Sequence, residues 1–242
     1  MSDTSRKDGR APDELRPIRF ERGFTENAPG SVLASFGRTR VLCTAMATDG
    51  VPPFLQGRGQ GWLTAEYSML PSSTESRKGR DRNGRIDGRS VEIQRLIGRA
   101  LRAVVDLGRM TERTVWVDCD VLQADGGTRT TAISGAWVAL HDLFTHMDAK
   151  RQLRSWPLVS QVAGLSVGVV GGVPMCDLCY AEDSQAGTDM NLVMTGEGHF
   201  VELQGSAEGA PFSQDDLAGM LALGSQGIRQ VFAAQKAALG LA

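Results

Sequence analysis

The stretch QADGGTRTTAIS, Gln123–Ser134, decides the fold of this chain. It follows the alternating run TVWVDCDVL (Thr114–Leu122), which is typical of a strand. It also opens the apolar run TAISGAWVALHDLF (Thr131–Phe144), whose spacing indicates a helix. A strand is therefore expected to enter a glycine-rich turn, and the turn is expected to lead directly into a helix.

This turn predicts a site for an oxyanion such as phosphate. Gly126 and Gly127 carry no Cβ, so the backbone can approach a ligand closely. Thr128 offers a hydroxyl at the expected helix cap, and the first helical N–H groups point outward with partial positive charge. Arg129 adds a fork of donors that suits a phosphate. The alternative is a strand–helix turn with a solvated arginine.

The composition indicates an ordinary globular protein. The chain has 242 residues, of which 41% are hydrophobic and 22% charged, and its net charge is −2. This balance excludes a basic field over the whole molecule, so a nucleic-acid site would need local clustering. We find no apolar run of about 18 residues and no signal-peptide core, so we expect no membrane association and a cytoplasmic location.

Alternating apolar residues between turn signals indicate strands in both halves of the chain. In the first half they are Arg19–Phe24, Ser31–Phe36, Thr39–Thr48, Trp62–Leu70 and Thr114–Leu122. In the second half they are Gly164–Val170, Met175–Ala181, Asp189–Thr195 and His199–Gln204. Gly37-Arg38 is predicted to join two strands as a hairpin, and Ser213 to cap a long final helix. Strands followed by a helix occur twice, which favours an α+β fold of two related β–α halves sharing one core.

The first sixteen residues are polar and are expected to be mobile, although Gly9, Arg10 and Arg16 could fold over something anionic. Cys176 and Cys179 have the C-x-x-C spacing of some zinc and redox sites. They fall in the predicted strand Met175–Ala181, where residues three apart face opposite sides, and no second pair completes four ligands. We therefore interpret them as ordinary thiols of a reducing compartment.

A basic segment precedes the glycine turn. From Arg77 to Arg102 the chain has nine Lys or Arg residues against three Asp or Glu residues. It comprises the polar loop Pro71–Gly88 and a helix that Ser90 is expected to cap and Gly108 to end. The exposed face of this helix carries Arg95, Arg99 and Arg102. A phosphate-rich partner or subunit contacts would explain the charge, and a solvated helix face is the alternative.

Two aspartates, Asp183 and Asp189, bracket the short segment DSQAGTD beside strand ends. Two carboxylates brought together by a turn can hold a divalent metal through oxygen ligands. Alternatively, one carboxylate keeps the other protonated, so that it serves as an acid. Aspartates that merely cap the turn would have the same spacing. The three histidines have no ligand spacing.

Five segments together resemble bacterial ribonuclease PH, in the order in which that family has them. They are GQGWLTAEYSMLP (Gly59–Pro71), GRSVEIQRLIGRALRAVVDL (Gly88–Leu107), DCDVLQADGGTRT (Asp118–Thr130), CDLCYAEDSQAGTDMNLVMT (Cys176–Thr195) and VELQGSAEGAPFS (Val201–Ser213). The likeness runs from about Arg10 to Ala238. It implies a ribosomal protein S5 domain 2-like fold, with one ribonuclease PH-type catalytic domain over 1–242 and halves of about 10–148 and 158–242.

The resemblance implies a phosphorolytic 3′→5′ exoribonuclease that trims tRNA precursors and other RNA 3′ ends in tRNA and rRNA processing. Inorganic phosphate is the implied co-substrate: it attacks the last phosphodiester and releases a nucleoside diphosphate. The implied phosphate ligands are Arg89, Gly127, Thr128 and Arg129. The implied catalytic and metal-linked carboxylates are Asp183 and Asp189, with Mg²⁺ as the expected ion.

The resemblance also implies a homohexamer, a trimer of dimers, joined through arginines after the MLP segment. Arg77 and Arg80 stand there, but Ser72 replaces an arginine that the family usually has. Arg95 and Arg99 are further candidates for RNA or subunit contacts.

Two other functions compete with this interpretation. A metal-dependent hydrolytic nuclease would also use paired aspartates, but it would not need the Gly-Thr-Arg cradle. An inactive RNA-binding ring subunit would be expected to lack Arg89, Arg129, Asp183 or Asp189, and all four are present.

Overall fold

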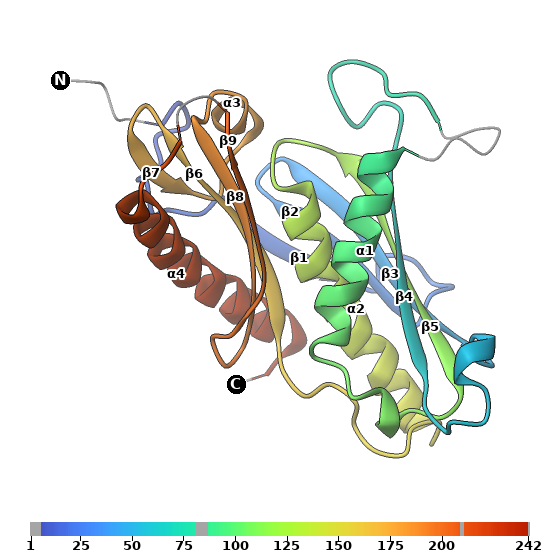
Figure 1. Cartoon of the computed structure of the whole chain (residues 1–242). Helices are drawn as coiled ribbons and strands as arrows, with labels where there is room; N and C mark the ends of the chain where they lie inside the picture. The colour runs from blue at the N-terminus through green and yellow to red at the C-terminus, as the bar shows by residue number, and fades with distance from the viewer. Residues whose placement is uncertain (1–5, 81–86, 209–210, 242) are drawn as a thin grey trace.

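The computed structural model describes residues 6–80, 87–208 and 211–241, and its first half forms a mixed five-stranded sheet. The strands are β1 (Ile18–Arg22), β2 (Gly30–Phe36), β3 (Thr39–Asp49), β4 (Trp62–Met69) and β5 (Arg113–Gln123), in the order β1-β2-β3-β5-β4. Neighbours are antiparallel except β4 and β5, which are parallel. Helices α1 (Gly88–Arg102) and α2 (Thr128–Ala149) lie along one face of this sheet (Figure 1). The predicted hairpin at Gly37-Arg38 is confirmed, because Phe36 pairs with Thr39.

The second half forms an antiparallel four-stranded sheet. Its strands are β6 (Val162–Val170), β7 (Val173–Cys176), β8 (Thr188–Thr195) and β9 (Phe200–Ala207), in the order β7-β6-β8-β9. The short helix α3 (Tyr180–Asp183) links β7 to β8, and the long helix α4 (Gln214–Leu239) ends the fold. In the part of the chain that the structure describes, no helix is both long and apolar enough to span a membrane.

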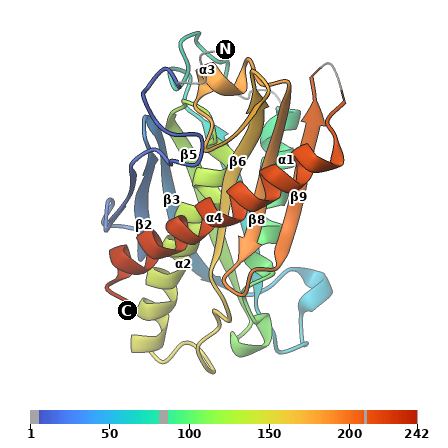
Figure 2. The ribbon, with the colours of Figure 1, turned by 90° about the vertical axis from the view of Figure 1, so that its left-hand side faces the viewer.

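Helix α2 is the shared centre of both halves. It packs on β2 and β3 on one side and on β6 on the other, and most of its side chains are buried. A helix that is apolar on all sides is expected in such a position. Helix α4 crosses the opposite face of the second sheet (Figure 2), so β6 is covered on both faces. The predicted α+β fold of two β–α halves around one core is confirmed.

A glycine brings the second sheet close to the start of α2. A Cβ on Gly164 of β6 would lie only 3.2 Å from the Cα, Cβ and Cγ2 atoms of Thr130, which is closer than most Cβ contacts in proteins. The amide of Gly164 donates to the hydroxyl of Ser134, one turn further along α2, at 3.2 Å. Consequently β6 places Ser166, two residues later, beside the glycine turn that begins α2.

The boundaries of α1 differ from the prediction. Asp87, not Ser90, is the N-cap, because its carboxylate accepts a hydrogen bond from the amide of Arg89. The helix ends at Arg102 rather than at Gly108, because Val105 pairs with Leu158 in an isolated bridge. The prediction for α4 is confirmed, since the Ser213 hydroxyl caps its first turn.

The predicted strand Met175–Ala181 is wrong beyond Cys176. Asp177 adopts a left-handed backbone conformation with φ of 51°, which ends β7. Cys179 is then the N-cap of α3, so the two cysteines do not share a strand. Burial raises the pKa of the Cys176 thiol to about 11, which keeps this thiol protonated at neutral pH and unreactive.

The expectation that the N-terminus is mobile is wrong for the described part, which starts at Arg6. Arg6, Arg10 and Arg16 are 4%, 9% and 5% exposed. Arg6 forms a bidentate ion pair with Glu182, and Arg16 forms one with Asp177. The alternative expectation, that this segment folds over something anionic, is confirmed: the anions are carboxylates of the second half. We call residues 6–17 the N-terminal strap.

Candidate active site

A cavity of about 340 Å³ lies where the two halves meet. Its walls come from the glycine turn, the start of α1, α3 and the strands β6 and β8. It brings together all the residues that the sequence predicted for phosphate and for the carboxylate pair: Arg89, Gly127, Thr128, Arg129, Asp183 and Asp189. The remaining lining residues are Met69, Thr74, Ala124, Gly126, Ser166, Tyr180 and Asn191.

The glycine turn depends on both of its glycines. Gly126 and Gly127 have φ values of 76° and 64°, which residues with a Cβ rarely adopt. A Cβ on Gly126 would also lie 2.4 Å from the carbonyl oxygen of Leu178. Gly127 is the N-cap of α2 and has no side chain, so it cannot cap the first amide groups of the helix. These amides start the helix at the cavity wall, an arrangement that favours an anion.

The predicted role of Thr128 as the helix cap is wrong, because Thr128 is the first residue of α2. Its hydroxyl instead accepts a hydrogen bond from the hydroxyl of Tyr67, which is 2% exposed, at 2.8 Å. Burial raises the pKa of Tyr67, so that phenol stays protonated and keeps donating. The Thr128 hydroxyl consequently retains its own hydrogen for a ligand in the cavity.

Two arginines line the cavity from different helices. Arg129 donates from Nη1 to Oε1 of Gln204 at 2.7 Å and to Oε1 of Glu92 at 3.3 Å, which fixes its position between the halves. Arg89 lies in the first turn of α1, and its exposed side chain forms no hydrogen bond within the described residues. Both guanidiniums line a cavity that is also bordered by the uncapped first amides of α2, which makes this wall positive although Glu92 is paired with Arg129.

The opposite wall carries the carboxylates. Asp183 ends α3 and Asp189 lies in β8. The Asp183 residue is exposed at the surface of the cavity. The protein around its carboxyl group nevertheless excludes part of the water, and this burial raises its pKa. The charge of Asp189 raises this pKa further, whereas Arg89, Arg129 and Arg16 lower it. The two carboxylates and the arginines therefore act on one another electrostatically.

This carboxylate pair suits one mode of metal binding. Mg²⁺ is commonly held by one or two carboxylates together with phosphate oxygens and water. The repulsion between Asp183 and Asp189 is what a bound cation would relieve. Within the described residues, no group of three or more His, Cys, Asp or Glu side chains could hold a metal. An ion at this site would thus depend on the substrate for further ligands.

Sequence reasoning missed the polar side chains of the second sheet. Asn191 pairs with Ser166 on one side and with Gln204 on the other, so the three form a row across the sheet. Ser166 and Asn191 line the cavity, and Gln204 holds Arg129. Of these three residues, only Asn191 could have been predicted from the sequence. It lies two residues after Asp189 and therefore faces the same side of β8.

The four arginines predicted for RNA or subunit contacts, Arg77, Arg80, Arg95 and Arg99, do not line this cavity. Arg77, Arg80 and Arg95 are exposed, and Arg80 lines a second cavity of about 170 Å³ that shares Met69 with the first. Arg99 is paired with Glu202 of β9. The middle of the predicted loop Pro71–Gly88, residues 81–86, lies outside the described residues.

Comparison with known proteins agrees with this division of the chain. Residues 14–144 match the 3′ exoribonuclease family, domain 1, and residues 160–227 match domain 2 of the same family. The chain belongs to the 3′ exoribonuclease family. Its α+β arrangement of two sheets is the ribonuclease PH fold that the sequence predicted.

Solved structures of similar fold have low sequence identity to this 3′ exoribonuclease family member. One is rice (Oryza sativa) Rrp46, with a TM-score of 0.74, 20% identity and 96% of each chain covered. Another is the Archaeoglobus fulgidus exosome with RNA bound to the active site, with a TM-score of 0.78, 21% identity and coverage of 96% of this chain and 92% of that chain. A third is an archaeal exosome core, with a TM-score of 0.79, 21% identity and coverage of 97% and 92%.

Proposed function

We propose that this chain is a phosphorolytic 3′→5′ exoribonuclease of the bacterial ribonuclease PH type, which trims the 3′ ends of tRNA precursors. One observation carries the proposal: a single cavity combines a glycine turn, two arginines and two aspartates. The arginine wall suits inorganic phosphate, and the carboxylate wall suits the bond that breaks. A purely hydrolytic nuclease would have no need of the first wall.

The reaction requires two anions to approach each other. A phosphate oxygen attacks the phosphorus of the last phosphodiester, the bond to the 3′ oxygen breaks, and a nucleoside diphosphate leaves. Arg89, Arg129 and the first amides of α2 offset the repulsion and orient the attacking phosphate. Thr128, held by Tyr67, adds a hydroxyl donor. The released 3′ oxygen takes up a proton, for which one of the two aspartates is the candidate donor.

Asp183 and Asp189 would also hold a divalent ion, which we expect to be Mg²⁺. When bound, such an ion would stabilise negative charge that develops on the leaving oxygen.

We further propose that the active form is a homohexamer, a trimer of dimers, with Arg77 and Arg80 at the contacts between dimers. Both side chains are exposed and form no ion pair within the described residues, so the folded chain does not explain their charge. An interface with carboxylates or carbonyl oxygens of another copy would do so. A ring would also set several basic surfaces around one tRNA.

The structural neighbours from exosomes suggest a competitor, a ring subunit that needs other subunits for activity. The purified chain distinguishes the two functions. We would incubate it with a tRNA that carries extra 3′ nucleotides, with Mg²⁺, and with or without inorganic phosphate. The proposal requires phosphate-dependent shortening and nucleoside diphosphates on thin-layer chromatography. Monophosphates as the main products would indicate a hydrolytic nuclease, and no shortening by the pure chain would favour the exosome-type subunit.

A further inference from the structure

Arg16 of the N-terminal strap makes an unusually complete set of contacts. Its amide and its Nε both donate to Oδ2 of Asp177, at 2.7 and 2.9 Å, and its Nη2 donates to Oδ1 at 2.6 Å. Arg16 is 5% and Asp177 is 1% exposed. The charges of this buried pair therefore balance each other, and the guanidinium is not free to bind a ligand.

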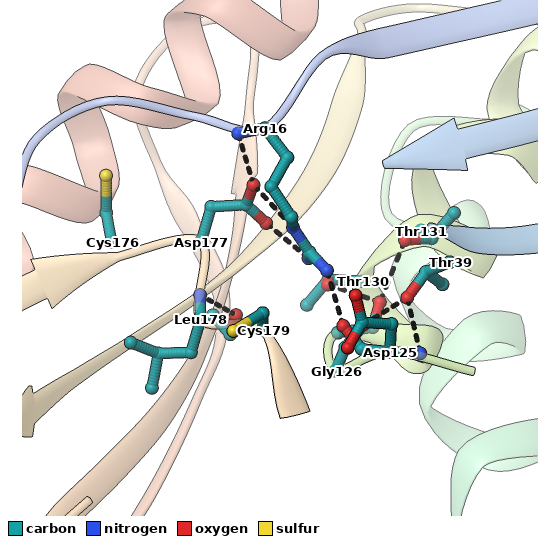
Figure 3. Close-up of polar contacts among 12 residues, drawn as sticks. Arg16, Thr39, Asp125, Gly126, Thr130, Thr131, Cys176, Asp177, Leu178 and Cys179 are labelled. Carbon is teal, nitrogen blue, oxygen red and sulfur yellow. Dashed lines mark hydrogen bonds and ion pairs between the residues drawn. The ribbon is translucent and has the colours of Figure 1, made fainter. Parts of the chain in front are cut away.

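The third guanidinium nitrogen of Arg16 reaches the glycine turn. Its Nη1 donates to the main-chain carbonyl of Asp125, the residue before Gly126 (Figure 3). A Cβ on Gly127 would lie 3.2 Å from Nη2, so the guanidinium also packs against the N-cap of α2. One side chain thus contacts the turn at both ends.

The other flank of the turn is held by β3. The hydroxyl of Thr39 donates to the carbonyl of Gly126 at 2.7 Å and accepts from the amide of Asp125 at 2.9 Å (Figure 3). Thr39 belongs to the same half as the turn, whereas Asp177 belongs to the other half. Arg16 is consequently one of the contacts that set the turn relative to the second half, together with the hydrogen bond from Arg129 to Gln204.

Asp177 leads directly into the carboxylate wall. Five residues separate it from Asp183, and the amide of Tyr180 between them lies 3.4 Å from Oδ1 of Asp125. Arg16 binds the carboxylate of Asp177, the left-handed residue that ends β7. The carbonyl oxygen of Asp177 accepts hydrogen bonds from Arg6 and Arg10. A shift of the Arg16–Asp177 pair would move the carboxylate wall against the arginine wall.

We infer that Arg16 is a positioning residue, which through Asp177 fixes the phosphate-binding turn against the segment that carries Asp183. This inference rests on the proposed phosphorolytic function. Only an arginine has the planar fork needed to bind both carboxylate oxygens while a further nitrogen reaches a carbonyl. A lysine has its three donors on one nitrogen and cannot reach these three oxygens in the same planar arrangement.

The test compares Arg16→Gln and Arg16→Lys with the matched control Arg22→Gln. Arg22 has the same pattern, a bidentate pair with Asp142 and a third bond from Nη1 to the carbonyl of Ala238, but it lies away from the cavity. We would measure KM for phosphate, kcat, tRNA Kd and the rise in Tm on adding inorganic phosphate. The last readout is independent of activity, since a ligand stabilises the fold that binds it.

Displacement of bound reactants by about 1 Å can cost about 100-fold in rate, so even a small shift of the turn is measurable. We expect Arg16→Gln to raise KM for phosphate at least about tenfold and to remove most of the phosphate-induced rise in Tm. Arg16→Lys should give an intermediate KM, and tRNA Kd should stay near the wild-type value in both. Arg22→Gln should keep the wild-type KM.

If Arg16→Gln does not fold, Asp177→Asn gives the same comparison, because it keeps the guanidinium and removes one of its acceptors. A folded variant of either residue with wild-type KM and wild-type phosphate stabilisation would overturn the inference. A wild-type protein that neither binds nor needs phosphate would instead overturn the proposed function, and the inference with it.

Discussion

Arg129 of the first half and Gln204 of the second half are joined by a hydrogen bond of 2.7 Å from Nη1 to Oε1. Nε2 of Gln204 in turn donates to Oε1 of Glu92 at 2.8 Å, and the same oxygen accepts from Arg129. Three side chains from α1, α2 and β9 therefore close one edge of the cavity. The guanidinium is held at a fixed place before any ligand arrives.

Arg129→Ala should raise KM for phosphate far more than it weakens tRNA binding. Loss of a charge-assisted donor pair to a bound anion costs about 1.5–3 kcal/mol, which corresponds to roughly 10- to 150-fold in KM. Gln204→Ala is the matched control, because it removes the hydrogen bond that holds Arg129 and leaves the positive charge of Arg129 in place. It should raise KM much less. Initial rates over a range of phosphate concentrations measure both, and equal losses for phosphate and tRNA would make Arg129 a general RNA contact.

Asp183→Asn and Asp189→Asn should each abolish trimming while tRNA binding stays nearly intact. Each change removes a negative charge, so it cannot weaken RNA binding through repulsion. The exposed Asp148→Asn, at the end of α2, controls for the loss of a surface charge and should keep normal activity. Single-turnover trimming at saturating Mg²⁺ measures the effect. A variant with near wild-type kcat would remove its aspartate from the mechanism.

The affinity for tRNA should fall steeply with salt, and Arg95 should contribute more to this slope than Arg99. Arg95 is exposed and unpaired within the described residues, whereas Arg99 already forms an ion pair with Glu202. Each phosphate contact contributes a little under one unit to the slope of log K against log salt. Arg95→Ala should therefore reduce the slope by about one unit, and Arg99→Ala by less. Salt titrations that give equal slopes for both variants would contradict this assignment.

The double variant Arg77→Ala/Arg80→Ala should convert hexamers to dimers and reduce tRNA trimming. Neither side chain supports the described fold, so the subunit itself should keep its Tm. Light scattering at micromolar concentration measures the assembly. Cleavage of a very short RNA should survive better than that of tRNA, because the cavity is intact. A double variant that remains hexameric would show that these arginines do not hold the ring.

Carboxylates on the face of the first sheet that no helix covers should make the free energy of unfolding depend on pH. Asp118 lies beside Glu66 in the parallel pair β4–β5, and burial first, then Glu66 and Asp120, raises its pKa above the ordinary 3.8. Its charged form is therefore disfavoured in the fold. This penalty is absent below the unfolded pKa, grows as pH rises through the folded pKa, and is complete at neutral pH.

Asp118→Asn should accordingly raise the free energy of unfolding at pH 7 by about 0.5–2 kcal/mol, the usual range for an improved surface charge. The gain should disappear below pH 3.8, where aspartate and asparagine are both neutral. Asp148→Asn is the control without these carboxylate neighbours in β4 and β5. Denaturant titrations at pH 7 and below pH 3.8 measure the free energy of unfolding of each variant. A gain that does not change with pH would mean that the effect is not electrostatic.

The sequence alone predicted those parts of the fold that depend on residues close together in the chain. The alternation of Thr114–Leu122, the glycines after it and the apolar run from Thr131 predicted β5, the turn and α2, although α2 starts three residues earlier. Arg129 was likewise found from its place after the glycine turn, whereas Arg89 was identified only through the resemblance of its segment to bacterial ribonuclease PH.

Other features depend on partners far away in the chain. The run Met175–Ala181 alternates like a strand, but the strand ends before Asp177, which has a left-handed backbone and whose carboxylate is bound by the distant Arg16. Ser166 and Gln204 reach the site only through their pairing with Asn191 across three strands. No spacing within the sequence carries that information. The roles of the site residues, the phosphate and metal ligands and the hexamer stay predictions.

The N-terminal strap also determines at which stage of synthesis and folding the cavity can form. Arg16 is synthesised 161 positions before Asp177, and Arg6 is synthesised 176 positions before Glu182. Contacts of such sequence separation form late in folding, after the intervening chain is available. On a translating ribosome, both arginines must wait for β7 and α3 to emerge before the two walls of the cavity meet. A partly made chain therefore has the glycine turn without Asp183 and Asp189 beside it, so the cavity is complete only after the second half has been made.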